Sequence, residues 1–129
     1  MIKNGLLNPA IASLVRRTRH TNRLVIADRG FPFWPEVETI DISVVDDLPT
    51  VVQVLQAILP NFQAGHAWMA QQFVDNNDQA TRDAFADALG GLEVRYEEHD
   101  DFKKRVPGSI GLIRTGDTVQ YANVILESA

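Results

Sequence analysis

Apolar and polar positions alternate between helix-like and strand-like patterns along the whole chain. Asn8 followed by Pro9 is typical of a helix start, because Asn caps free backbone N–H groups and Pro suits the first helical position. Ile11 and Leu14 then give the spacing of one apolar helix face. The pattern therefore predicts a first helix that ends near residues 18–20.

The apolar run Leu24–Ala27 indicates a strand that is covered on both faces. The same patterns predict further strands and helices. The strands are expected at Thr39–Ser43, Ala64–Ala70, Leu92–Tyr96, Ile110–Arg114 and Ala122–Leu126, and the helices at 49–59, 78–89 and 99–104. The last two strands flank the turn Thr115-Gly116-Asp117 and are candidates for a hairpin.

Strands separated by helices of about ten residues imply crossover connections and a mainly parallel sheet with helices on both faces. The chain shows no internal repeat, low-complexity stretch or linker. The expected fold class is therefore α/β, with residues 1–129 forming a single three-layer α/β/α domain.

Composition and charge exclude several classes of partner and of chemistry. The formal net charge is -5, and the basic clusters are short, at residues 16–19 and Lys103–Arg105, so a nucleic-acid partner is not expected. No apolar run reaches the ~20 residues of a membrane helix, and the N-terminus lacks the apolar core of a signal peptide. The absence of cysteine excludes disulfides and thiolate chemistry. These features favour a cytoplasmic protein that handles a neutral, polar small molecule.

Residues that bind a ligand or act on it are expected at the carboxyl ends of the strands, where open α/β sheets bind ligands. Asp28 directly follows the strand Leu24–Ala27, and His99 follows the strand Leu92–Tyr96. His20 precedes the first strand, so the pattern leaves open whether it approaches Asp28.

Histidine is the side chain best suited to proton transfer near neutral pH. Of the three histidines, His66 lies within a predicted strand without an acidic neighbour in sequence and is interpreted as structural. No helical histidine pair, calcium loop, Gly-rich phosphate loop or nucleophile elbow is present. No metal or cofactor is therefore expected.

Several segments together resemble the D-ribose pyranase and L-fucose mutarotase family. Their order and spacing carry the resemblance, because no single segment is specific. They are Leu7-Asn8 with Ile11, residues 19–22, 24–28, 40–41, 48–55, 94–103, 113–116 and 121–126.

The resemblance implies an enzyme that interconverts cyclic forms of a free monosaccharide without a cofactor. By the family pattern, His20 corresponds to the catalytic acid, and the substrate-binding positions are Asp28, His99, Tyr121, Ala122 and Asn123. The family also implies a homo-oligomeric ring, a pentamer or a decamer, with sites where subunits meet.

Thr21, Ala122 and His99 favour the ribose branch over the fucose branch. Arg19, Asn22, the aromatic loop 31–35 and the short C-terminus depart from the family pattern. Three alternatives therefore stay open: a fucose-type mutarotase, a non-catalytic sugar-binding protein, and a purely structural ring-forming protein.

Overall fold

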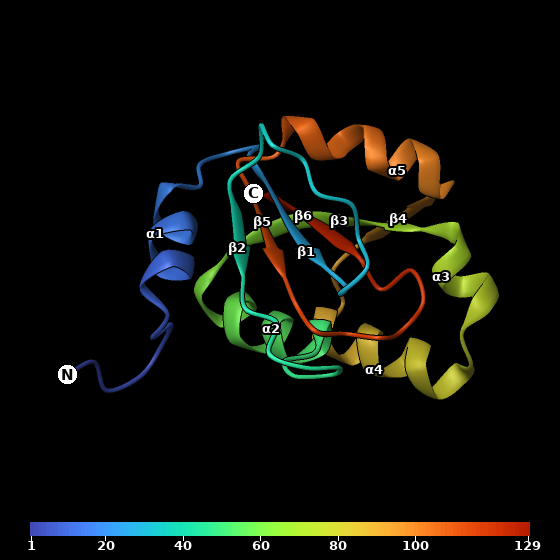
Figure 1. Cartoon of the computed structure of the whole chain (residues 1–129), viewed down its shortest axis with the longest axis horizontal. Helices are drawn as coiled ribbons and strands as arrows, with labels where there is room; N and C mark the ends of the chain where they lie inside the picture. Colours follow the sequence, from blue (N-terminus) through green and yellow to red (C-terminus); the bar gives the residue numbers. More distant parts are fainter.

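A computed structural model describes all 129 residues of the chain (Figure 1). One 6-stranded sheet has the order β2-β5-β1-β6-β3-β4. The strands are β1 (Arg23–Ala27), β2 (Thr39–Asp41), β3 (Ala64–Ala70), β4 (Val94–Glu97), β5 (Gly111–Arg114) and β6 (Val124–Ser128). The α-helices are α1 (Pro9–Arg17), α2 (Val51–Ile58), α3 (Gln71–Asn76), α4 (Gln79–Leu89) and α5 (His99–Arg105), and 3₁₀ turns follow α2 at Leu59–Asn61 and α5 at Val106–Gly108.

The sheet is mainly parallel, as the sequence predicts, and only β6 runs opposite to its neighbours. β1 pairs in parallel with β5, β5 with β2, and β3 with β4, whereas β6 lies antiparallel between β1 and β3. The predicted hairpin of the last two strands is therefore wrong, because β1 separates β5 from β6.

The reason lies in the turn after β5. Thr115 donates from its backbone N–H and its Oγ1 to the carbonyl of Ala27, at 2.9 and 2.8 Å. The Arg29 N–H in turn donates to the carbonyl of Asp117 at 3.1 Å. These bonds lead the connection across the carboxyl end of β1 to the far side of that strand.

Helices cover both faces of the sheet, which confirms the three-layer α/β/α architecture. α1, α2, α3 and α4 bury apolar side chains against one face, around Leu24, Ile26 and Met69. α5 packs against the other face through Phe102, over Val25 and Ile125. Figure 1 shows α5 on one side of the sheet and α2 and α4 on the other. No helix combines the length and apolar character that crossing a membrane requires.

Local signals account for most helix ends. The Asn8 side chain accepts a hydrogen bond from the Ile11 N–H at 3.0 Å, and Asp78 caps α4 in the same way. α4 ends at Gly90 in the left-handed conformation, with φ 57°. The sequence patterns missed α3, because this helix of 6 residues has no capping side chain and buries only Phe73.

Candidate functional site

The carboxyl edge of the sheet gathers most of the residues expected in a site. Asp28 follows β1 and His99 follows β4, whereas Tyr121 and Asn123 precede β6. Because β6 is antiparallel, its amino end lies at the edge where the parallel strands end.

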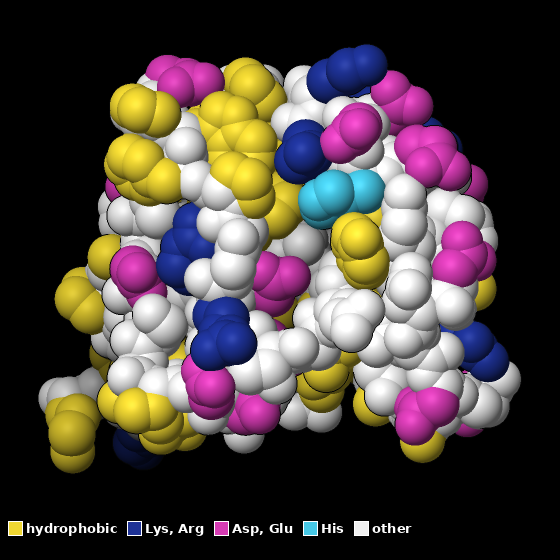
Figure 2. Space-filling view, turned by 45° about the vertical axis from the view of Figure 1, so that its right-hand side comes forward, with side chains coloured by type: hydrophobic (Ala, Val, Ile, Leu, Met, Phe, Trp, Pro, Cys, Tyr) yellow, Lys and Arg dark blue, Asp and Glu magenta, His cyan; other side chains and the backbone are white.

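These four residues line a hollow of about 350 Å³ together with Gly30, Phe31, Pro32 and Gln120. A volume of this order lies within the usual range for small-ligand sites. Figure 2 turns this part of the molecule toward the viewer and shows a hollow beside a histidine side chain. Acidic and basic side chains are interspersed on the face shown, so charge alone does not mark it for an anionic ligand.

Asp28 and Asn123 form a hydrogen-bonded pair in the wall of the hollow. The Asn123 Oδ1 accepts from the Asp28 N–H at 2.8 Å, and its Nδ2 donates to the Asp28 Oδ2 at 3.1 Å. The Gly30 N–H donates to the other carboxylate oxygen of Asp28 at 3.0 Å. Burial raises the pKa of Asp28, while these hydrogen bonds act against the rise. The pair thus presents a fixed carboxylate acceptor.

His99 forms a second part of the wall, at the start of α5. Its ring stacks on Phe102 with centroids 6.2 Å apart and meets the edge of Tyr121 at 5.1 Å. Its Nδ1 is buried without a hydrogen-bond partner. Burial, and secondarily the charge of Lys103, lowers the pKa of His99 below 6.5. The imidazole is therefore mainly neutral at neutral pH and can accept a proton.

Two residues of the segment before β6, Tyr121 and Ala122, differ in their relation to the hollow. Tyr121 adopts the left-handed backbone conformation, with φ 56°, which is unusual for a bulky residue and typical of functional sites. Ala122 is fully buried in the core and lines no part of the hollow, so the structure does not bring this expected binding residue into the site.

His20 lies at the opposite edge of the sheet from the hollow. It is exposed and belongs to the turn before β1, in which the Asn22 N–H donates to the Arg19 carbonyl at 2.9 Å. Thr21 in this turn has φ 65°, a left-handed conformation that a β-branched residue rarely adopts. The length of β1, roughly 16 Å for five residues, separates this turn from Asp28. Within one chain, His20 does not join the hollow.

His66 lies on β3, and its surroundings fit a structural role. Its ring packs on Trp68 with centroids 4.3 Å apart, and its Nε2 lies 3.8 Å from a Glu127 oxygen. No three His, Asp or Glu side chains gather closely enough to hold a metal ion.

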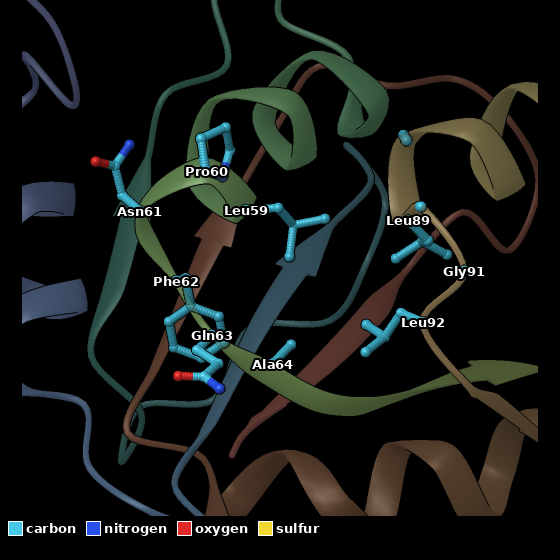
Figure 3. Close-up of a pocket in the computed structure, with 11 residues that line it drawn as sticks. Leu59, Pro60, Asn61, Phe62, Gln63, Ala64, Leu89, Gly91 and Leu92 are labelled. Carbon is cyan, nitrogen blue, oxygen red and sulfur yellow. The ribbon is translucent and has the colours of Figure 1, made fainter.

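The largest cavity of the molecule, about 780 Å³, lies elsewhere (Figure 3). It opens where β3 begins and where the chain enters β4, and Leu59, Leu89 and Leu92 are arranged around it. None of its lining residues is titratable. Proton transfer therefore cannot take place there through a side chain, and the smaller hollow is the better candidate site.

Sequence reasoning left several residues of the hollow out. Gly30 and Pro32 were visible only as loop signals, and Phe31 only as part of an aromatic loop. Phe31 is buried against Phe102 and faces the His99 ring at 6.1 Å. Gln120 carries no local signal, and its place in the hollow depends on the path of the chain into β6.

The fold and this hollow define a small α/β protein with a polar candidate site at the carboxyl edge of its sheet. The chain belongs to the RbsD / FucU transport protein family, whose model matches residues 1–129. This result confirms the family resemblance seen in the sequence.

Individual relatives cover nearly the whole chain. The D-ribose pyranase of Chromobacterium violaceum is 38% identical over 128 residues, which span 99% of this chain and 97% of that protein. The structure of Bacillus subtilis RbsD complexed with D-ribose superposes with a TM-score of 0.91 at 28% identity and covers 100% of this chain and 98% of that one. The fucose mutarotase of Streptococcus pneumoniae in complex with L-fucose has a TM-score of 0.82 at 20% identity over 99% of this chain and 98% of that one, and it supports the fold alone.

Proposed function

We propose that this protein is an intramolecular isomerase that exchanges the pyranose and furanose forms of free D-ribose by acid–base catalysis. The observation that carries the proposal is the hollow in which Asp28, Asn123, Tyr121 and a neutral His99 converge. Carboxylate, amide and phenol groups suit the hydroxyls of a sugar. The relatives named D-ribose pyranase and the structure of RbsD with D-ribose favour ribose as the substrate.

The reaction requires only proton transfers. Opening a cyclic hemiacetal delivers a proton to the ring oxygen and removes one from the anomeric hydroxyl, after which the open-chain aldehyde closes through another hydroxyl. We assign the delivery to His20 and the removal to His99, while Asp28 accepts a hydrogen bond from a sugar hydroxyl. A positioned acid or base accelerates such a step by roughly 10²–10⁴-fold. This suffices because the sugar ring also opens unaided.

His20 and the hollow must come from different copies of the chain if both act on one sugar. His20 is exposed at one edge of the sheet, and Asp28 lies at the other. We therefore propose a homo-oligomeric ring, a pentamer or a decamer, in which the edge that carries His20 faces the hollow of the next copy. We also propose that the protein acts in the cytoplasm.

The activity is tested by NMR saturation transfer on a panel of free sugars that includes D-ribose and L-fucose. We expect faster pyranose–furanose exchange of ribose, and loss of the acceleration in His20→Ala. His66→Gln is the matched control and should remain active, because its ring packs on Trp68 and lines no part of the hollow. Acceleration of fucose anomer exchange alone would select the mutarotase alternative, and ribose binding without acceleration would select the binding-only alternative.

The shared site is tested by mixing two inactive variants. His20→Ala and Asp28→Ala each damage a different half of the site, so subunits exchanged between them should form some intact sites and recover activity. A mixture of His20→Ala with His20→Gln is the control and should stay inactive. Absence of recovery in a verified mixed oligomer would show that both residues must act from one chain.

A further inference from the structure

Arg114, at the end of β5, makes an unusual set of contacts beside the hollow. Its Nη1 donates to the carbonyls of Asp28 at 3.2 Å and Arg29 at 3.4 Å, and its Nη2 donates to the carbonyl of Pro32 at 3.1 Å. Arg114 is half-buried and forms no salt bridge, and all of its side-chain hydrogen bonds go to backbone oxygens.

The register of the sheet explains why Arg114 reaches this segment. β5 lies directly beside β1, and Arg114 pairs with Ala27, the last residue of that strand. Successive side chains of a strand alternate between its faces. Leu112 packs in the layer of α5, so Arg114 lies on the same face, on which the segment Asp28–Pro32 turns away from β1.

The segment Asp28–Pro32 has opposite polarity on its two sides. On one side, the Gly30 N–H donates to the Asp28 carboxylate, and a hydrogen bond from the Phe31 N–H also lowers the pKa of this carboxylate. The carbonyls of residues 28, 29 and 32 are directed at Arg114 instead. One guanidinium thus donates to three carbonyl oxygens of the segment, while the Asp28 carboxylate accepts from the amides of Gly30 and Phe31. Together these contacts help to define the course of the segment.

This segment supplies a large part of the hollow. Asp28, Gly30, Phe31 and Pro32 line it, and the buried Phe31 also faces the His99 ring. A shift of the segment would therefore move the carboxylate and the aromatic wall at the same time.

We propose that Arg114 is a positioning residue that holds Asp28–Pro32 in the conformation that binds the sugar. The role depends on the fork of the guanidinium, because a lysine ammonium is a single point charge and cannot span these three oxygens in the same way. That the ligand is a sugar rests on the proposed function, whereas the effect of Arg114 on the segment Asp28–Pro32 does not.

The test compares Arg114→Met with the wild-type protein by calorimetry with D-ribose and by ribose exchange. We expect affinity to fall by about tenfold or more while the turnover of bound ribose changes less, because the loss affects binding geometry. Arg82→Met is the matched control. Arg82 likewise donates to backbone carbonyls, of Val74 and Asn77, and lines no part of the hollow, so its variant should bind ribose normally.

Two further measurements separate positioning from a general loss of fold. In Arg114→Ala, free guanidinium well below denaturing concentrations should restore part of the affinity, and Arg114→Lys should restore less than the wild-type side chain. In the absence of sugar, the Gly30 amide resonance should follow the titration of Asp28 in the wild-type protein and cease to do so in Arg114→Met.

The outcomes are distinct. A Gly30 amide that still follows Asp28 in Arg114→Met, or an unchanged ribose affinity, would overturn the role of Arg114. A wild-type protein that does not bind ribose would overturn the proposed function, and the Gly30 measurement would still decide the role of Arg114.

Discussion

The two edges of the sheet differ in what they offer a ligand. The carboxyl edge holds a hollow of about 350 Å³ lined by the half-buried carboxylate of Asp28, the amide of Asn123 that donates to it, and the imidazole of His99, whose pKa burial lowers. The amino edge holds a cavity of about 780 Å³ without a titratable lining residue, and an exposed His20. The comparison teaches that groups whose pKa burial shifts mark a candidate site better than the size of a cavity does.

The largest expected effect comes from Asn123→Ala at the carboxyl edge. Asn123 is 2% exposed and makes both an accepted and a donated hydrogen bond with Asp28. Its removal should lower ribose exchange by roughly 10²–10³-fold and unfolding free energy by about 1–3 kcal/mol, because the half-buried Asp28 carboxylate and the Asp28 N–H each lose a hydrogen-bond partner. NMR exchange rates and urea titration measure the two effects.

The matched control for this prediction lies at the amino edge. Asn61 lines the larger cavity and donates only to the carbonyl of Ala57, from an exposed position, at 3.3 Å. Asn61→Ala should therefore leave both exchange and stability close to wild type. Equal losses in the two variants would remove the functional distinction between the edges.

An intermediate effect, on stability alone, is expected at the large cavity. Leu89 is 6% exposed and belongs to the core cluster, so Leu89→Ala should lower the free energy of unfolding by about 2–4 kcal/mol. The rate of ribose exchange per folded molecule should stay the same, because this side chain lies at the other edge of the sheet. Leu89→Met keeps the volume and should lose less stability. A variant that remains folded but loses exchange would show that the cavity participates in the reaction.

The smallest effect is a pH dependence of stability that involves His99. Because burial lowers the pKa of His99 below 6.5, the unfolded chain binds more protons than the folded one between the lowered pKa and 6.5. Unfolding free energy should therefore rise with pH through that window, and His99→Gln should remove this part of the rise. Urea titrations from about pH 5 to about pH 7 compare the slopes. Identical slopes in both proteins would contradict the neutral imidazole at the carboxyl edge.

Local signals in the sequence were sufficient for most elements. The strand Ala64–Ala70 has the predicted bounds, and Asn8, Asp78 and Gly90 mark helix ends where the pattern placed them. These features depend on hydrogen bonds and side-chain spacing within a few residues, which a single sequence displays. α3 was missed because it shows neither a capping side chain nor a broad apolar face.

The candidate site was only partly accessible to the same reasoning. The carboxyl-end rule placed Asp28 and His99 at one edge, and the structure confirms this placement. Tyr121, Ala122 and Asn123 came from family resemblance, because nothing local shows that the strand after them runs antiparallel. The contacts of Arg114 with Asp28–Pro32 were likewise invisible, since they depend on β5 lying beside β1.

The sequence by itself determined most of the helices and strands, the α/β class and the edge at which Asp28 and His99 lie. Only the tertiary structure decided that β6 enters between β1 and β3, which brings Asn123 against Asp28 and leaves His20 at the far edge. The physical reason is range: caps and apolar spacing act over one or two turns, whereas strand order and direction depend on packing between segments far apart in the chain.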